Sequence, residues 1–244
     1  MEMNTALILC AGYGKRLRPI TLSKPKPLIN IKNKSLLLRA IELVNTIGIK
    51  KVKINTYYKS DILETFVKNS QYRDIIEIIN DGNEILDTGG GIMNMIKDCD
   101  DENFLVMNPD TIWDNSYKQI INEMINHYQD YRLDNLLLVV NKVHSFDKTL
   151  KGDFALKNSK LTKENNNQYI YTGLQIINKN LFNDMKAKKF SMNTIWENEI
   201  KKNNLNGFES KNQFLHLTDL RIYEQIIKKL CDFLIFLYLN NLQI

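Results

Sequence analysis

Short apolar runs alternate with amphipathic segments over roughly the first 140 residues of the chain. Five of the runs predict buried strands: residues 6–9, 52–54, 75–79, 104–107 and 136–140. Three longer segments with helical spacing of apolar residues predict helices: residues 35–47, 60–69 and 117–128. This alternation predicts right-handed β-α-β crossovers, a mostly parallel sheet and an α/β fold class.

The pattern is less regular in the rest of the chain. Three glycines at residues 89–91 interrupt the alternation, and we expect only a short helix after them, at residues 92–97. From about residue 148 the sequence becomes polar and irregular, with a hairpin or exposed loop expected at 157–168 and a strand at 169–177. Residues 222–239 predict a helix. Because there is no internal repeat and no linker, we expect one domain.

The net charge and the cysteines do not change the predicted fold class or domain organisation. The net charge of +5 suits anionic ligands, but the lysines are spread along the sequence and form no basic tract of the kind that binds nucleic acid. Cys10, Cys99 and Cys231 form no Cys-x-x-Cys pair, which is typical of reduced thiols in a cytoplasmic enzyme. No signal peptide and no apolar stretch of roughly 20 residues is present. We therefore expect a cytoplasmic protein with no nucleic-acid or membrane partner.

Residues 10–28, CAGYGKRLRPITLSKPKPL, are the most informative stretch of the chain. They follow the first predicted strand. Gly12 and Gly14 allow the backbone to turn sharply and to approach a ligand closely. Arg16 supplies positive charge, and Lys26 is held between two prolines. A strand followed by a glycine turn and fixed cations suits the binding of a triphosphate.

The spacing in this stretch excludes two commoner phosphate-binding loops. A P-loop requires G-x-x-x-x-G-K-[ST], whereas this chain reads GYGKRL. A dinucleotide-binding fingerprint requires a third glycine where Leu17 stands. Pro19 also opposes a long helix directly after the turn.

Three candidate segments each follow a predicted strand: the Gly12 turn, the loop at Thr88, and Asp110. Ligands of open α/β sheets bind beyond the carboxyl ends of the strands. We therefore expect these segments to meet at one edge of the sheet. A carboxylate at that edge can bind Mg²⁺, which prefers hard oxygen ligands and phosphates; the alternative for Asp110 is an Asx-turn.

Residues 9–28 resemble the signature of the sugar-1-phosphate nucleotidyltransferase family. The resemblance continues in four short segments: LDTGGG at 86–91, NPDTIW at 108–113, GDF at 152–154 and YTG at 171–173. Their order is most similar to that of the bacterial N-acetylmuramate-1-phosphate uridylyltransferases. The likeness extends from about residue 6 to about residue 223.

The resemblance implies a fold and a domain organisation. The expected fold is a three-layer, Rossmann-like, mostly parallel sheet with a small substrate-binding β insertion. We expect one nucleotidyltransferase domain at residues 1–225, with a nucleotide-binding half at 1–115 and a sugar-phosphate-binding half at 116–225. The remaining residues, 226–244, would form a helical apolar tail that can cover the core or join a homodimer.

The resemblance also implies an activity. A Mg²⁺-dependent enzyme of this kind transfers a nucleotidyl group from a nucleoside triphosphate to a sugar-1-phosphate and releases pyrophosphate. UTP and N-acetylmuramate-1-phosphate are the expected substrates, in peptidoglycan recycling. Two alternatives remain open: another sugar-1-phosphate or phosphocholine nucleotidyltransferase, such as a mannose-1-phosphate guanylyltransferase, or a non-catalytic nucleotide-binding subunit.

The family's functional positions map onto this sequence by its motifs. Arg16 and Lys26 correspond to catalytic cations that stabilise the transition state and pyrophosphate, and Asp110 to the first metal ligand. The nucleotide-binding positions are Ala11, Gly12, Gly14, Lys15, Thr88, Gly89 and Gly90. The sugar-binding positions are Gly152, Asp153, Thr172 and Gly173. For Thr88 the alternative is that its side chain caps a helix.

The chain departs from the family near its end. The family usually completes its metal site with an aspartate, and His216 stands at that place in the segment FLHLTD. A neutral imidazole can bind a metal, although it suits Mg²⁺ less well than oxygen. We expect His216 to contact metal or phosphate, directly or through water. Replacement by Asp219 after a local shift, or a weakened site, are the alternatives.

Overall fold

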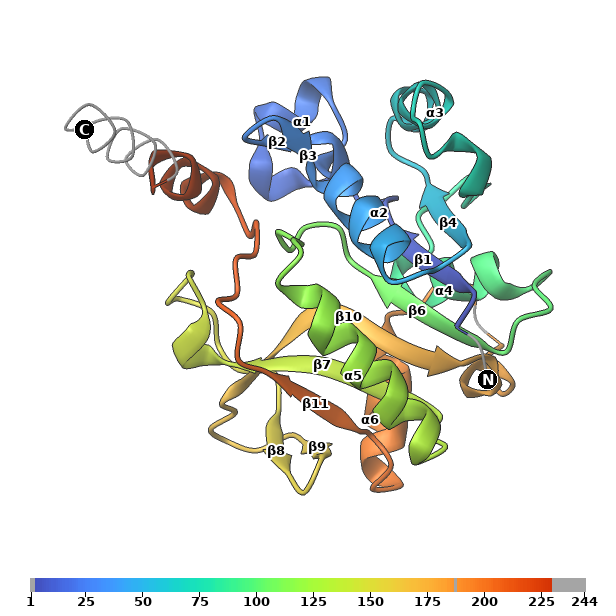
Figure 1. Ribbon diagram of the computed structural model, residues 1–244, viewed down its shortest axis with the longest axis vertical. Coiled ribbons are helices and arrows are strands. Elements are labelled where there is room, and N and C mark those ends of the chain that lie inside the picture. Colours follow the sequence, from blue (N-terminus) through green and yellow to red (C-terminus); the bar gives the residue numbers. More distant parts are fainter. Residues whose placement is uncertain (1–2, 187, 230–244) are drawn as a thin grey trace.

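The computed structural model of the protein describes residues 3–186 and 188–229. Its centre is a seven-stranded sheet in the order β11-β7-β10-β6-β1-β4-β5. The strands are β1 (Thr5–Leu9), β4 (Lys51–Thr56), β5 (Ile76–Asn80), β6 (Asn103–Met107), β7 (Asn135–Asn141), β10 (Tyr169–Asn178) and β11 (Gly207–Ser210). All neighbouring pairs are parallel except those of β10, which runs antiparallel to β6 and β7. This arrangement confirms the predicted, mostly parallel α/β sheet (Figure 1).

Helices cover both faces of the sheet. Helices α2 (Leu36–Thr46), α3 (Ser60–Lys68) and α5 (Tyr117–Asp130) contribute to the hydrophobic core of one face. Helices α4 (Asp87–Ile96) and α6 (Met192–Lys201) contribute to the core of the other face. In Figure 1, α2 and α5 lie in front of the sheet and α6 behind it. The molecule therefore has the three layers that the sequence predicted.

The strands carry apolar runs because helices cover both faces of the sheet. In β1, Ala6 and Ile8 belong to one core and Leu7 to the other, because successive side chains of a strand point to opposite faces. All three side chains are fully buried. A strand that is buried on both faces must be apolar at every position, which explains why the sequence shows runs rather than alternation.

Smaller elements complete the fold. Two hairpins pair β2 (Asn30–Ile31) with β3 (Lys34–Ser35), and β8 (Ala155–Lys157) with β9 (Lys160–Thr162). The second hairpin overlaps the segment predicted as a hairpin or loop at 157–168, but it begins at Ala155, before that segment. The remaining elements are short helical turns: η1 (Lys15–Leu17), α1 (Ile20–Ser23), η2 (Lys26–Leu28), η3 (Arg73–Ile75), η4 (Lys142–His144) and η5 (Lys179–Phe182).

The structure corrects the sequence prediction at one helix and adds several elements, of which α6 and β11 are the largest to join the core and the central sheet. Helix α4 begins at Asp87 and includes the three glycines at 89–91, whereas we expected a helix only from residue 92. Helix α6 and strand β11 were not predicted. Met192, Ile195 and Trp196 have helical spacing and were a usable signal for α6, whereas β11 (GFES) has a single large apolar residue.

The C-terminal prediction is only partly covered by the structure. Residues 220–229 are helical, and Ile222 and Ile226 pack against Leu17 and Ile29 near the glycine turn. Most of the predicted tail at 226–244 lies outside the described residues, so its role in a homodimer stays a prediction. Within the described part of the chain, no helix is long and apolar enough to cross a membrane.

Candidate active site

A cavity of about 230 Å³ lies at the carboxyl ends of the parallel strands. It is lined by the turn after β1, by the start of α4 and by the turn after β6. The predicted site residues that line it are Ala11, Gly12, Gly14, Lys26, Thr88 and Asp110. The expectation that the three strand-following segments meet at one edge of the sheet is therefore fulfilled.

The glycine turn is shaped by a left-handed residue. Gly14 has φ +61°, and a Cβ at this position would lie 2.9 Å from Thr21 Cγ2 and 3.0 Å from Lys26 Cβ. The Thr21 hydroxyl donates a hydrogen bond of 3.0 Å to the Gly14 carbonyl oxygen. Only glycine allows the turn to lie this close to the Lys26 segment. The turn and the lysine are therefore one packed unit.

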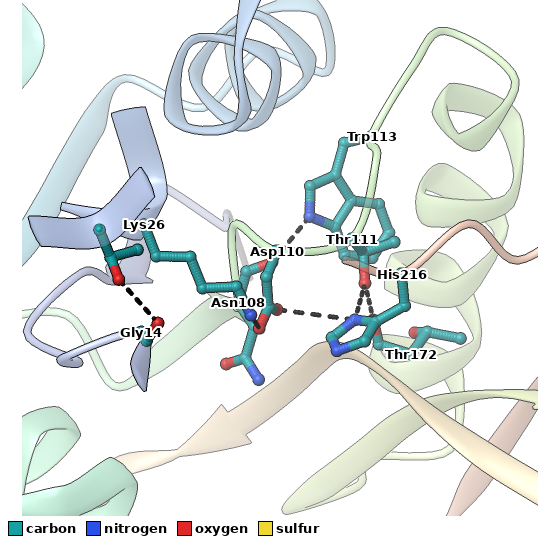
Figure 2. A network of polar contacts seen from close by, with 9 residues as sticks. Gly14, Lys26, Asn108, Asp110, Thr111, Trp113, Thr172 and His216 are labelled. Carbon is teal, nitrogen blue, oxygen red and sulfur yellow. Dashed lines mark hydrogen bonds and ion pairs between the residues drawn. The ribbon is translucent and has the colours of Figure 1, made fainter. Parts of the chain in front are cut away.

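Lys26 forms an ion pair with Asp110 across the cavity (Figure 2). Its Nζ lies 2.6 Å from Asp110 Oδ2, and the two side chains are 15% and 20% exposed. Pro25 precedes it in an extended conformation, and Lys26 begins the short turn η2. Because prolines restrict the backbone on both sides, the ammonium group is held toward the carboxylate.

The pKa of Asp110 reflects this pairing. Burial by itself would raise the pKa of the carboxyl group. The charges of Lys26 and His216, together with the hydrogen bond from Lys26, outweigh burial and lower the pKa of Asp110 to about 2. Asp110 is therefore ionised at neutral pH, as a metal ligand must be.

Other parts of the chain fix the turn that carries Asp110. The backbone N–H of Asn108 donates a 2.7 Å hydrogen bond to the carbonyl oxygen of Gly173. The indole N–H of Trp113 donates a 2.8 Å bond to the Asn108 carbonyl oxygen. The N–H of Leu217 donates a 2.8 Å bond to the carbonyl oxygen of Asp110 itself. The carboxylate is therefore presented by a well-supported backbone.

His216 lies beside this carboxylate (Figure 2). Its Nδ1 is 3.7 Å from Asp110 Oδ1 and 3.3 Å from the Thr111 hydroxyl. The ring stacks on Phe214 at 5.6 Å between centroids. Burial lowers the pKa of His216, although the Asp110 carboxylate acts in the opposite direction. The lowered pKa favours the neutral ring, which is the form in which imidazole binds metals.

Asp219, the alternative to His216, has another role in the structure. Its Oδ1 accepts a 2.9 Å hydrogen bond from the backbone N–H of Ile222. It thus caps the start of the helix at 220–229, a common use of aspartate. His216 is consequently the residue of this segment that lies next to Asp110.

The donor set near Asp110 fits a divalent metal ion. Asp110 Oδ1 is buried and has no hydrogen-bond partner among the described residues. A hard, anionic oxygen that lacks a partner suits Mg²⁺. Within the described residues, no group of three or more His, Cys, Asp or Glu side chains is arranged so that it could hold a metal ion by itself. Asp110 and His216 would therefore share the ion with substrate phosphates, as Mg²⁺ sites commonly do.

The glycines of α4 are explained by close packing. A Cβ at Gly89 would lie 2.3 Å from the Phe190 ring, and one at Gly90 would lie 2.1 Å from the Lys188 carbonyl oxygen. Both positions are buried, and neither lines the cavity. Thr88 does line the cavity, and its hydroxyl oxygen accepts a 2.9 Å bond from the Met192 N–H. Their contact with a base stays a prediction.

The four predicted sugar-binding residues also have structural roles. Gly152 lies so close to Asn167 that a Cβ would be 2.2 Å from its carbonyl oxygen. Asp153 accepts a 2.9 Å hydrogen bond from the Tyr171 N–H. Thr172 is buried and donates to the Leu138 carbonyl oxygen. Gly173 has φ +90° where the pairing of β10 with β7 shifts register. None of the four lines the cavity, and sugar binding stays a prediction for them.

Lys15 and Arg16, which directly follow the glycine turn, are exposed. Arg16 lies in η1 and does not line the cavity, although its charge contributes to lowering the pKa of His216. The ammonium group of Lys15 lies 5.2 Å from the centre of the Tyr13 ring. Contacts of either side chain with phosphate stay predictions.

Sequence reasoning did not name as site residues three polar residues that line the cavity: Asn55, Asp87 and Asn108. Asn55, near the end of β4, accepts a 2.8 Å hydrogen bond from the Cys10 N–H and donates a 3.0 Å bond to Asp81. Asp87 opens α4 in a left-handed conformation, with φ +62°. The rule that ligands bind beyond the strand ends was a usable signal for Asn55, because this residue follows the predicted strand at 52–54.

Sequence relatives match the chain over different lengths. The mannose-1-phosphate guanylyltransferase catalytic subunit beta of Drosophila melanogaster is 37% identical over 125 residues, which are 50% of this chain and 34% of that protein. The chain thus matches about a third of that relative's length. The N-acetylmuramate alpha-1-phosphate uridylyltransferase of Caulobacter vibrioides is 22% identical over 221 residues, which are 88% of this chain and 91% of that protein.

Solved structures and family models agree with these matches. UDP-glucose pyrophosphorylase complexed with UDP-glucose matches 95% of this chain and 99% of its own, with a TM-score of 0.74 and 16% identity, so the two share a fold. The family model for nucleotidyl transferases matches residues 5–146, which is more than half of the chain. That segment contains the glycine turn, Lys26 and Asp110. The chain therefore belongs to the nucleotidyl transferase family.

Proposed function

We propose that this protein transfers a nucleotidyl group from a nucleoside triphosphate to a sugar-1-phosphate and releases pyrophosphate. The observation that carries the proposal is the convergence of the glycine turn, Lys26 and Asp110 on one cavity at the carboxyl edge of the sheet. A glycine turn and a lysine suit phosphates, and a carboxylate with a free buried oxygen suits the accompanying metal ion.

The chemistry of the reaction asks for charge and position rather than for a nucleophilic side chain. A phosphate oxygen of the sugar phosphate forms a bond to the α-phosphorus, while the bond from the α-phosphorus to the pyrophosphate oxygen breaks on the opposite side. Preorganised cations and backbone amides lower the barrier by stabilising the charge on the phosphate oxygens. Magnesium, held by Asp110 and His216, would supply further charge neutralisation.

The ion pair between Lys26 and Asp110 can open during substrate binding without leaving a buried charge unpaired. When a triphosphate and a metal ion enter together, the ammonium group can turn to a phosphate oxygen and the carboxylate to the metal ion. Each charge then exchanges one partner for another, so neither is left buried and unpaired. We propose that Arg16, which is exposed in η1, contacts the leaving pyrophosphate with its guanidinium fork.

For the substrates, we propose UTP and N-acetylmuramate-1-phosphate, in the recycling of peptidoglycan. The support is the similarity to the uridylyltransferase of Caulobacter vibrioides, which extends over 88% of this chain. The second candidate pair is GTP and mannose-1-phosphate. The guanylyltransferase of Drosophila melanogaster is more similar, at 37% identity, but its match covers only 50% of the chain.

Pyrophosphate release from purified protein tests the proposal. Each of the four nucleoside triphosphates is combined with Mg²⁺ and with a panel of sugar-1-phosphates. UTP with N-acetylmuramate-1-phosphate should give the fastest release, and GTP with mannose-1-phosphate would instead support the second pair. Nucleotide binding without turnover of any acceptor would contradict transferase activity and support a binding subunit.

A matched pair of variants ties the activity to the site. Asp110→Ala should lower turnover by about 100-fold or more, because it removes the metal-binding carboxylate and the partner of Lys26. Asp100→Ala removes an exposed carboxylate outside the cavity and should leave turnover unchanged. Equal activity in both variants would exclude Asp110 from the reaction.

A further inference from the structure

We infer that Asp147 is a positioning residue, which together with Arg221 holds the segment that carries His216 beside Asp110. The inference rests on the proposed function and adds two residues that do not line the cavity. Neither residue belongs to the motifs that identified the site in the sequence.

The segment that carries His216 runs alongside the turn that carries Asp110. The N–H of Ile112 donates a 2.8 Å hydrogen bond to the carbonyl oxygen of Leu215, and the N–H of Leu217 donates a 2.8 Å bond to that of Asp110. His216 is the residue between these two bonds. A shift of this segment would therefore move the imidazole ring relative to the Asp110 carboxylate (Figure 2).

The other side of the segment is bonded to the loop that contains Asp147. The N–H of Phe146 donates a 2.9 Å hydrogen bond to the carbonyl oxygen of Phe214, and the N–H of Phe214 donates a 3.0 Å bond to that of His144. Asp147 directly follows Phe146. Through its backbone, the loop therefore holds the segment at a point before His216.

The side chain of Asp147 holds the chain at a point after His216. The carboxylate is 2% exposed, and its Oδ1 lies 3.4 Å from Arg221 Nη2. The same oxygen accepts hydrogen bonds of 3.0 and 2.6 Å from the N–H and the hydroxyl group of Thr149. Burial raises the pKa of Asp147, but the hydrogen bonds from Thr149 and Arg221 outweigh burial and lower it. The carboxylate is therefore charged at neutral pH and pairs with the guanidinium.

A contribution to stability alone does not explain a buried carboxylate at this place. Burial of a charge costs desolvation, so an apolar residue of similar volume often stabilises a fold equally well. The ion pair instead gives a fixed geometry: it holds Arg221 after His216, while backbone bonds hold Phe214 before it. Since a displacement of about 1 Å at a reacting group can cost about 100-fold in rate, a segment held on both sides of His216 matters for catalysis.

Three variants change the ion pair and leave His216 in place. Asp147→Asn and Arg221→Gln each remove one charge, while Arg221→Lys retains the cation. Glu197→Gln is the matched control, because Glu197 forms a 2.9 Å ion pair with Lys163 on the exposed surface, outside the cavity. The readouts are kcat and KM from pyrophosphate release, and deuterium uptake of residues 214–218 by mass spectrometry. Each variant is measured alone and combined with His216→Ala.

Asp147→Asn and Arg221→Gln should each lower kcat by about 10-fold, as loss of a residue that orients a site residue commonly does. Both should raise deuterium uptake at residues 214–218, because the segment is held less firmly. Arg221→Lys should lose less than about 3-fold in kcat, and Glu197→Gln should match the wild type. Combined with His216→Ala, the Asp147 and Arg221 changes should cause no further loss of kcat, because they act through the same ring.

The combination with His216→Ala separates positioning from a general loss of stability. Losses that multiply in the combined variants, or wild-type kcat and deuterium uptake in both Asp147→Asn and Arg221→Gln, would overturn the inference. If Asp147→Asn does not fold, Arg221→Gln decides, because this side chain is half-exposed. If the wild type turns over no acceptor, the proposed function fails, and deuterium uptake at residues 214–218 alone decides whether Asp147 holds the segment.

Discussion

The two oxygens of Asp110 have different surroundings, and this difference is the main result at the scale of the residue. Oδ2 lies 2.6 Å from the Lys26 ammonium, while Oδ1 is buried without a hydrogen-bond partner among the described residues. One oxygen keeps the carboxylate ionised, and the other remains available to a metal ion. A carboxylate that only stabilised the turn would be expected to have both oxygens bonded.

This pairing predicts a dependence of stability on pH. The pKa of Asp110 in the folded protein is lowered to about 2, so its ionised form stabilises the fold above the unfolded pKa near 4 and loses that effect as the pH falls toward 2. At pH 7 the free energy of unfolding should be about 2 kcal/mol higher for the wild type than for Asp110→Asn. Urea denaturation at several pH values measures this difference.

The difference in the free energy of unfolding between the wild type and Asp110→Asn should shrink as the pH is lowered from about 4 to about 2, because the wild-type carboxylate then becomes protonated. A gap that stays constant over this range would show that the carboxylate does not interact with Lys26 in the folded protein.

At the scale of the residue, the sequence was informative where the backbone conformation requires a residue type, or where neighbouring residues restrict the backbone. Gly14 and Lys26 could be identified because a positive φ requires glycine and because the flanking prolines are visible in the sequence. Asp87 could not, because a single aspartate before a threonine has no distinctive pattern, and its left-handed backbone appears only in three dimensions.

At the scale of the element, helix α4 joins the cavity to the segment before α6. The Gly90 N–H donates a 3.0 Å hydrogen bond to the Phe190 carbonyl oxygen, and the Met192 N–H donates to the Thr88 hydroxyl. Glycine disfavours helices in isolation, which is why the sequence predicted a break there. In the folded protein the missing side chains allow this close contact, so tertiary packing outweighs helix propensity.

Gly90→Ala distinguishes helix propensity from tertiary packing, because the two effects change the free energy of unfolding in opposite directions. Helix propensity alone would stabilise the protein by about 1 kcal/mol. The added Cβ would lie 2.1 Å from the Lys188 carbonyl oxygen, which belongs to the backbone and cannot move alone. We therefore expect a net loss of about 1–3 kcal/mol in the free energy of unfolding, measured by urea denaturation.

Asn122→Ala provides a control, since Asn122 lies on the exposed face of α5 and makes no contact of this kind. It should change the free energy of unfolding by less than about 0.5 kcal/mol. If Gly90→Ala proved as stable as the wild type or more so, the packing explanation for the glycines would be wrong.

At the scale of the whole molecule, the order of strands brings the site together. The glycine turn and Asp110 follow the adjacent strands β1 and β6, Asn55 lies near the end of the neighbouring strand β4, and all three strands run parallel. The sequence predicted that the glycine turn, the Thr88 loop and Asp110 would meet, because parallel strands place their carboxyl ends at one edge. It did not predict β11, whose pairing with β7 depends on contacts between residues about 70 positions apart.

The second half of the chain contributes to the same sheet through β7, β10 and β11. Strand β10 lies beside β6, and Gly173 in that strand supports the turn that carries Asp110. The position of the Asp110 carboxylate thus depends on residues from both halves of the chain, which is consistent with one folding unit. The division into a nucleotide half and a sugar-phosphate half stays a prediction.

The crystal structure of the protein with a nucleoside triphosphate and Mn²⁺ tests the central claim most directly, because the anomalous signal of manganese identifies the metal position. We expect the phosphates to contact the glycine turn and Lys26, the base to lie beside Thr88, and manganese to bind Asp110. A triphosphate bound outside this cavity, or manganese bound elsewhere while Lys26 and Asp110 remain paired, would contradict the proposed site.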